Sequence, residues 1–338
     1  MALFRSAPTA ALALGSLLLS VSTALADDAS GTFSLRLEND FIGDTDGHYT
    51  HGSRLDWVSD KAGEGGPNFV RDTLQFLFPF ADIHDGRIGF ALGQNIYTAA
   101  DTSRSTPDPD DRPYAGWLYV GASLHGETPR GQGSFDTLDS VELDVGIVGP
   151  QAFGEEVQNG YHSLAGFGKA QGWDHQLKNE PAVVVFASRT WRSAPVDLGL
   201  VKLDVLPEVD GSLGNVSIHA GAGGVVRVGQ GLDVDYGPSR NPPSSSAAPV
   251  INPDREFAWY GFAGVNGRAV AHNIFLDGNT FVDSPSVDRE VFVGDLRFGL
   301  AMIYSGWRLE FAETLRTKEF KGQDSDDRFA TLTLSARF

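Results

Sequence analysis

Hydrophobic and polar residues alternate along many short stretches of the chain. FATLTLSARF (residues 329–338) puts leucine, alanine and phenylalanine on one face and threonine, serine and arginine on the other. VELDVGIV (141–148) and WRLEFAETLRT (307–317) repeat the pattern with charged residues on the polar face, until Glu313 breaks it. A period of two indicates β-strands. A dry sandwich core cannot hold these charges, whereas the wet interior of a barrel can, so the pattern favours a barrel.

The alternation predicts an all-β fold: a closed antiparallel transmembrane β-barrel of about twelve strands. An even strand number places both chain ends on the periplasmic side. Residues 149–181 are too long for a hairpin turn and predict a short extracellular helical insertion, and the Pro- and Ser-rich residues 237–254 predict a loop without chemistry. The predicted strands are residues 32–40, 49–59, 87–97, 114–125, 139–148, 182–191, 196–207, 215–228, 257–271, 291–301, 307–318 and 329–338.

The N-terminal segment predicts export. Residues 1–26 combine Arg5, an apolar run over residues 10–21 and the small-residue sequence Ala24-Leu25-Ala26, as in a secretory signal peptide. No later stretch holds the roughly 18 consecutive apolar residues of a membrane helix. We therefore expect a signal peptide at residues 1–26 and one barrel domain at residues 27–338, located in the bacterial outer membrane.

Composition narrows the class of partner. The formal net charge is -18, and removal of Arg5 with the signal peptide would make it -19. This acidity argues against nucleic acid and is compatible with divalent cations, although it also serves plain solubility. Forty glycines and 11% aromatic residues suit an antiparallel barrel, and the absence of cysteine excludes disulfides and thiol chemistry.

Three polar clusters are expected at one end of this barrel. If the N-terminus is periplasmic, the connections after the first, third and fifth strands lie outside the cell; they contain residues 37–54, residues 93–117 and the predicted helix. In GEEVQNGYHSLAG the four-residue spacing of Gln158 and His162 places both on one helix face. His162 could act as a base near neutral pH and Gln158 could orient substrate or water, but an exposed histidine can also be inert.

The other candidates have plain alternatives. Asp40, Asp44 and Asp46 form an acidic turn that could bind a cation, but their spacing differs from the twelve-residue calcium loop, and such turns also form for backbone reasons. Thr50 is predicted on the inward face of the second strand, where a threonine needs no function. Arg104 lies among aspartates and, taken alone, is a surface charge.

Two other function classes remain open. His51 and Ser53 share a strand face, as a Ser-His pair of an outer-membrane phospholipase would. The chain could also be a non-catalytic barrel, structural or a small-solute pore, that binds lipopolysaccharide. A lumen filled by inward arginine and glutamate side chains would argue against the pore.

Several motifs together resemble one family. END followed by TDGHYTHG, GQNIYT with DRPYAGWLYVG, and VGPQAFGEEVQNGYH with GWDHQLKNEP are similar to the outer-membrane lipid A 3'-O-deacylases and their uncharacterised relatives. The likeness covers about residues 32–181; beyond it only the strand pattern and the terminal Phe338 continue. It implies a twelve-stranded barrel with a site between the wall and an extracellular helix, where Ca²⁺ assists hydrolysis of the acyl ester at the lipid A 3' position.

The resemblance also assigns roles to individual residues. Asn39 and Asp40 match the cation and substrate site, with Asp40 as the metal ligand, and Thr50 matches a strand threonine. Gln158 matches a site glutamine and His162 the base, which would take a proton from the attacking water. The implied partner is lipid A, or lipopolysaccharide, of the outer leaflet, and we expect a monomer.

Two positions depart from the family pattern. The site lysine falls on Arg104, which keeps the charge but cannot be deprotonated; together with the cation it would stabilise the oxyanion. An acidic residue that follows the helix falls on Gly168. Asp174 or another nearby carboxylate would have to replace it.

Overall fold

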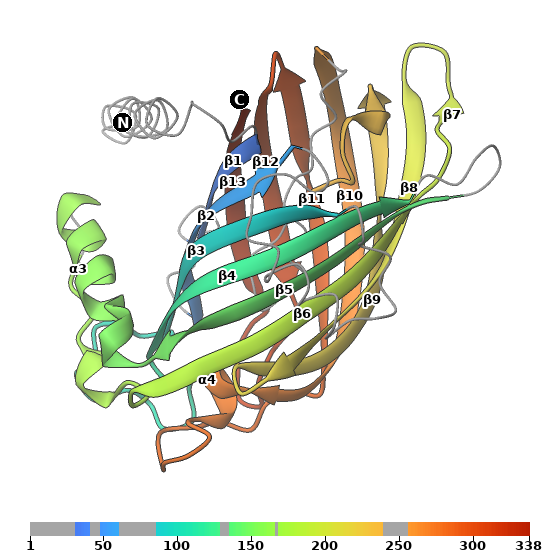
Figure 1. Cartoon of the computed structure of the whole chain (residues 1–338). Coiled ribbons are helices and arrows are strands. Elements are labelled where there is room, and N and C mark those ends of the chain that lie inside the picture. The colour runs from blue at the N-terminus through green and yellow to red at the C-terminus, as the bar shows by residue number, and fades with distance from the viewer. Residues whose placement is uncertain (1–30, 41–47, 61–85, 129–134, 166–167, 239–255) are drawn as a thin grey trace, which may run out of the picture.

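The chain forms one closed antiparallel sheet in a computed structural model (Figure 1). The structure describes residues 31–40, 48–60, 86–128, 135–165, 168–238 and 256–338. The predicted signal peptide, Asp44 and Asp46 lie outside these residues, and so does most of the predicted loop at residues 237–254. No helix in the described ranges is long and apolar enough to cross a membrane.

Twelve strands form the wall, and one further short strand lies beside it. Wall strands pair in chain order, β1 pairs with β13, and β6 pairs with β8, which closes the barrel. The predicted fold class is therefore confirmed. The wall strands are β1 (Gly31–Asn39), β2 (His48–Ser59), β3 (Arg87–Thr98), β4 (Ala115–Thr128), β5 (Asp136–Val148), β6 (Glu180–Arg192), β8 (Lys202–Gly214), β9 (Ser217–Gln230), β10 (Phe257–Asn273), β11 (Phe292–Tyr304), β12 (Trp307–Arg316) and β13 (Asp327–Arg337).

The predicted seventh strand, at residues 196–207, is divided in two. The two-residue β7 (Val196–Asp197) pairs only with β8, and a tight turn separates them. Leu198 N donates to Val201 O at 2.9 Å, and Gly199 adopts a φ of 94°, which favours glycine. Continuous alternation in the sequence concealed this turn.

The alternation sorts residues between the interior and the outer face, as predicted. On β1, Ser34, Arg36 and Glu38 are buried inside the barrel, while the hydrophobic residues between them are partly exposed on the outside. The same division recurs on the neighbouring strands. Charged and polar residues therefore fill the interior, and hydrophobic residues cover the surface that faces lipid.

Ion pairs occupy the interior. Arg54 of β2 donates to both carboxylate oxygens of Glu142 on β5, at 2.7 and 2.9 Å. Arg268 and Arg316 share the carboxylate of Asp295. These side chains are at most 8% exposed, so they depend on one another for charge compensation. An interior filled in this way argues against a wide small-solute pore.

The connection after β9 also enters the barrel. Its short helix η4 (Leu232–Val234) buries both terminal side chains, and Asp235 follows with a fully buried carboxylate. That carboxylate accepts hydrogen bonds at 2.6, 2.7 and 3.1 Å from Arg227, Tyr260 and Arg308 respectively. The connection thus closes part of the interior by charge pairing.

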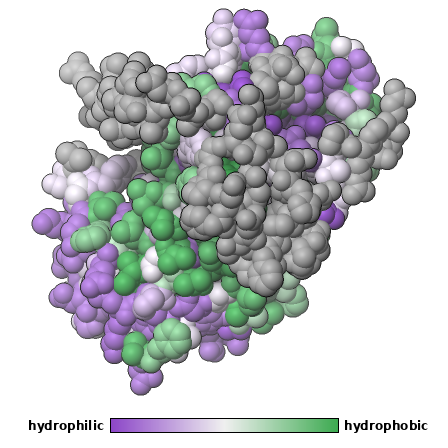
Figure 2. All heavy atoms as spheres, in the orientation of Figure 1, coloured by the Kyte–Doolittle hydropathy of each residue, from purple (hydrophilic) through white to green (hydrophobic). Residues whose placement is uncertain are grey.

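Hydrophobic side chains run around the outer wall. Strand register aligns one exposed or partly exposed residue on each of β1 to β6 in a single row: Leu35, Leu55, Leu92, Val120, Val145 and Val183. Figure 2 shows hydrophobic residues gathered across the middle of the visible face, above a hydrophilic lower end. Towards the chain ends, Trp57 stacks on Phe90 at 6.1 Å between ring centroids, typical of an aromatic girdle.

We expect Asp235→Asn to weaken the barrel, because it removes a buried carboxylate that Arg227 and Arg308 share and leaves each with one other, Asp204 and Glu310 respectively. The cost should therefore lie below about 3–5 kcal/mol, the cost of a buried charge left with no partner. The folded band on a denaturing gel should therefore disappear at a lower temperature than in the wild type. Asp283→Asn is the matched control, because its side chain is exposed. Equal unfolding temperatures for all three proteins would contradict this account of the interior.

Candidate functional site

The three polar clusters leave the barrel at the same end. Gly31 at the start of β1 and Phe338 exchange backbone hydrogen bonds at 3.3 and 3.0 Å, so both lie at one end of the barrel. Neighbouring strands run antiparallel, so the connections after β1, β3 and β5 lie at the opposite end, where Figure 1 places α3. We call this the α3 end. The predicted shared rim is confirmed.

The predicted helical insertion is present and carries Gln158 and His162 on one face. It comprises η2 (Pro150–Ala152), α3 (Gly154–Ala165) and η3 (Gly172–His175). Gln158 and His162 are only 3% and 5% exposed, although most of α3 is exposed. The helix therefore turns a polar face toward the barrel, whereas a surface helix usually turns its apolar face to the protein.

Glycines allow α3 to start close against the wall. A side chain on Gly116 of β4 would come within 3.3 Å of Gly154, and one on Gly154 would come within 2.6 Å of the Trp173 ring. Gly116 faces outward, because its neighbours Ala115 and Trp117 pack inside the barrel. The insertion therefore covers the outer side of the wall.

Gln158 is held by one hydrogen bond and has capacity for another. Its Oε1 accepts from Trp173 Nε1 at 2.9 Å. Trp173 packs edge-on against Tyr114 and is buried with Ile96 and Ala99 on the outer face of β3. The buried Gln158 Nε2 has no hydrogen-bond partner among the described residues. It is therefore a fixed donor that a bound molecule could use.

A backbone carbonyl orients His162. Its Nδ1 lies 2.7 Å from Gly168 O, and because a carbonyl only accepts, Nδ1 must carry the proton. In the neutral ring the lone pair is then on Nε2, the arrangement that a general base needs. Gly168 thus contributes through its backbone, and a Cβ there would meet no atom within 4 Å.

A β-bulge corrects the prediction for Thr50. The register between β2 and β3 shifts between Tyr49 and His51, so Tyr49 occupies the inward position and bonds Glu38 at 2.6 Å. Thr50 Oγ1 instead lies 2.7 Å from Thr98 Oγ1. Thr98 follows the inward-facing Tyr97. The bulge therefore turns Thr50 toward the side of the wall that the insertion covers.

Asn39 joins this arrangement at the end of β1, where its Nδ2 donates to Thr50 O at 2.9 Å. Asp40, the next residue, is 3% exposed. Thr98, which bonds Thr50, precedes Ala99, and Ala99 packs in the Trp173 cluster that holds Gln158. A continuous set of contacts therefore connects the Asn39 and Thr50 cluster to the polar face of α3.

The structure does not bring Arg104 into this set. Arg104 lies in the connection between β3 and β4 and pairs with Asp108 at 3.0 Å, with both side chains 47% exposed. Water screens such a pair strongly, so it holds Arg104 only weakly. Asp174 is exposed on η3. The predicted roles of both residues stay predictions.

The described residues supply only part of a ligand set for a metal ion. No group of three or more histidine, aspartate or glutamate side chains that could hold a metal occurs in the described ranges. Asp40 supplies one buried carboxylate, and Asn39 beside it supplies an amide, both with the oxygen donors that Ca²⁺ prefers. The donor type fits Ca²⁺, whereas a complete ligand set would require groups beyond these two.

The alternative Ser-His pair gains no support from geometry. His51 and Ser53 both lie on the outer face of β2, as predicted. No hydrogen bond between these two described side chains is present in the structure. Nucleophilic catalysis by serine depends on such a bond.

Sequence reasoning missed His48, which ties three connections together at the α3 end. Its Nδ1 lies 2.7 Å from Asp327 Oδ1, 279 residues away, and its Nε2 lies 3.3 Å from Asp111 Oδ1. Burial would raise the pKa of Asp111, but the hydrogen bond from His48 and backbone amides lower it overall. GHY and DDRP contain these residues, but nothing local pairs them.

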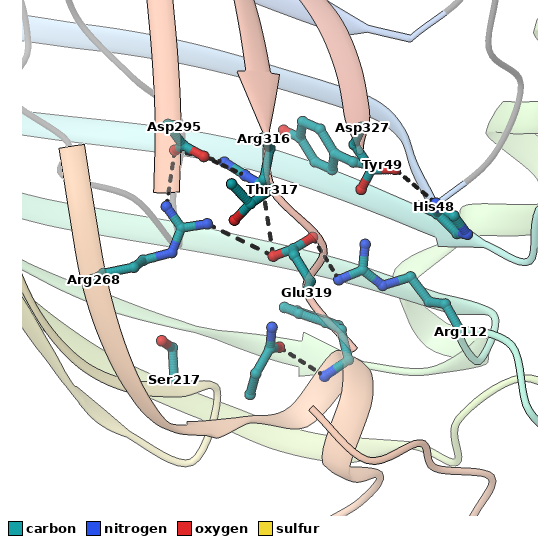
Figure 3. Close-up of polar contacts among 12 residues, drawn as sticks. His48, Tyr49, Arg112, Ser217, Arg268, Asp295, Arg316, Thr317, Glu319 and Asp327 are labelled. Atoms are coloured by element: carbon teal, nitrogen blue, oxygen red, sulfur yellow. Dashed lines mark hydrogen bonds and ion pairs between the residues drawn. The ribbon is translucent and has the colours of Figure 1, made fainter. Parts of the chain in front are cut away.

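Beside His48, Glu319 forms a second such tie (Figure 3). Its carboxylate accepts from Arg112 at 2.9 Å and lies 3.7 and 3.8 Å from Arg268 and Arg316. Burial would raise the pKa of Glu319, but the three guanidinium groups outweigh it and lower the pKa from 4.5 to about 2. These ion pairs therefore hold together the connections at the α3 end that carry the site.

Comparison with known proteins decides the family. The sequence profile described as "Outer membrane protein LpxR" matches residues 12–338. The chain belongs to the LpxR family. It is accordingly a bacterial outer-membrane protein, as the strand pattern predicted, and membership in the LpxR family places it beside the lipopolysaccharide of that membrane.

A solved structure of LpxR has the same architecture. The chain is similar to "LpxR from Salmonella typhimurium", with a TM-score of 0.73 and 21% identity over 91% of this chain and 100% of that one. A KdgM porin is a weaker likeness, with a TM-score of 0.36 and 8% identity over 91% of this chain and 99% of that one. The β domain of the Bordetella autotransporter Brka has a TM-score of 0.41 and 11% identity over 92% of this chain and 99% of that one. No curated protein sequence matches significantly. The first likeness establishes the fold.

We expect stability to fall as the pH drops from about 4.5 to about 2, where Glu319 becomes protonated. Its folded-state pKa is lowered, so its contribution is fully present above pH 4.5 and is lost towards the folded value. Glu319→Gln should be less stable at pH 7 and show a flatter acid transition. Both effects are measured by the temperature at which the folded band disappears from a denaturing gel, for samples held at pH values across this range. Glu256→Gln, on an exposed side chain, should match the wild type; a wild-type transition in Glu319→Gln would refute the assignment.

Proposed function

We propose that the chain is a lipid A deacylase that hydrolyses the acyl ester at the 3' position, with His162 as the general base. One observation carries the proposal: α3 buries Gln158 and His162 against the outer wall of an LpxR-family barrel. A buried polar group is costly unless it is hydrogen-bonded, and a ligand could supply the partner that Gln158 Nε2 lacks among the described residues.

The contacts of His162 suit proton abstraction. With Nδ1 donating to Gly168 O, Nε2 can accept a proton from water that attacks the ester carbonyl. The Gln158 Nε2 donor, fixed by Trp173, would orient that water or the carbonyl oxygen. Asn39 and Thr50 would bind the substrate from the wall side. No acyl-enzyme is required.

The position of these residues suits a membrane substrate. They lie on the outer side of the wall, toward lipid, and not in the ion-paired interior. A lipid A molecule could therefore reach them while its acyl chains stay in the outer leaflet. This placement avoids the cost of withdrawing the chains into water.

We further propose that Asp40 binds a Ca²⁺ ion. When bound, the ion would supply positive charge for the oxyanion that develops on the ester. Arg104 is the candidate second cation: its pairing with Asp108 is exposed, so an anionic substrate could displace that partner. The carbonyl of Gly168, by holding the His162 ring, performs its positioning role without a side chain.

His162→Ala should reduce deacylation by about 100- to 10,000-fold, the usual contribution of a general base. Mass spectrometry of lipid A from cells that express each form measures the loss of the acyl chain. His175→Ala is the matched control, an exposed histidine of the same insertion. If cells that express the folded wild-type protein also show unchanged lipid A acylation, the enzyme proposal fails. A non-catalytic barrel that binds lipopolysaccharide is then favoured.

Chelation should abolish activity of the purified protein, and added Ca²⁺ should restore it better than Mg²⁺, which prefers stricter octahedral geometry. Asp40→Asn should raise the Ca²⁺ concentration that gives half-maximal activity, because it removes a charged ligand. Asp283→Asn should leave that concentration unchanged. Full activity in the presence of chelator would remove Ca²⁺ from the proposal.

A further inference from the structure

The surface of α3 divides into three sectors. The buried sector contains Gln158 and His162, as described above. A second sector is exposed and polar and includes Glu155, Glu156 and Ser163. The third is exposed and hydrophobic: Val157 and Tyr161 are 40% and 47% exposed, and Phe153, one turn earlier, is 53% exposed. At about 100° per residue, the last two sectors lie on opposite flanks of the buried one.

Backbone hydrogen bonds fix the position of Phe153, the first residue of the hydrophobic flank. Phe153 adopts a left-handed φ of 58°, and its amide donates to Pro150 O at 3.1 Å. Its carbonyl accepts from Val157 N at 3.1 Å, which starts the helix. The Phe153 ring is exposed, while two hydrogen bonds hold its backbone. Residues other than glycine rarely adopt this conformation, and these two bonds stabilise it here.

The flank continues the lipid-facing surface of the barrel. Val145 and Ile147 lie on the outer face of β5, and η2, which contacts both β4 and β5, leads from them to Phe153. Leu118 on β4 is paired with Ile147 in the same outer row. Hydrophobic surface thus lies on both sides of η2, whose exposed residues are Pro150 and Gln151.

We propose that the Phe153, Val157 and Tyr161 flank of α3 lies in the outer leaflet and contacts lipid acyl chains, while the Glu155, Glu156 and Ser163 flank faces water. A helix with an apolar flank and a polar flank can lie at a membrane interface with its apolar side chains among the acyl chains. The inference rests on the outer-membrane location and not on the proposed chemistry. It would place the polar face of α3 at the depth where headgroups meet acyl chains.

Single cysteines test the proposal cleanly, because the natural chain has none. Val157→Cys, Ser163→Cys and Leu92→Cys are each labelled with a nitroxide in the full barrel, folded in phosphatidylethanolamine and phosphatidylglycerol vesicles. Collision with oxygen reports lipid, and collision with a water-soluble nickel chelate reports water. Leu92, 52% exposed on the wall, is the lipid reference.

We expect the label at Val157 to behave like that at Leu92, with oxygen collisions several-fold above nickel collisions, and the label at Ser163 to show the reverse. Equal nickel access at residues 157 and 163 would overturn the proposal. Exclusion of both reagents with spin–spin broadening between copies would overturn it in favour of self-association. Tyr161→Cys provides a second site on the same flank if Val157→Cys does not fold. Lipid A acylation, assayed separately, does not affect this outcome.

Discussion

A barrel wall in a membrane exposes one face to lipid, and a charged side chain on that face is costly. This constraint sends Arg54, Glu142 and the other charges into the interior, where they pair. The insertion after β5 lies on the outer side of the same wall. Thr50 and Thr98 face that side too, next to Ala99 of the Trp173 cluster, so polar side chains gather there at the lipid boundary.

Alternation was sufficient to predict the barrel, because the side of each strand residue follows from a period of two. The four-residue spacing of Gln158 and His162 likewise sufficed to predict that they share one helix face, although it did not predict that this face is buried. What escaped prediction depends on the third dimension. The bulge at Thr50 reverses one residue against the period, and the bond between His48 and Asp327 joins residues 279 positions apart. Neither leaves a local signal.

Charge pairs fix both ends of the barrel. At the α3 end, Glu319 gathers Arg112 and two other arginines beneath the connections that carry the site. At the opposite end, Asp235 holds the β9–β10 connection inside the barrel. Charge pairs of this kind are demanding rather than strongly stabilising, since each partner requires the others. They nevertheless fix the ends of strands that would otherwise depend on turns alone, and they fill space that a channel would need.

The bond between His162 and Gly168 has a consequence for how relatives of this chain should be compared. The imidazole is held by a peptide carbonyl, a group that every amino acid possesses. Residue 168 can therefore change while the His162 ring keeps its orientation, provided that the backbone there follows the same path. A missing carboxylate at this position in an alignment would then report nothing about how the His162 ring is held.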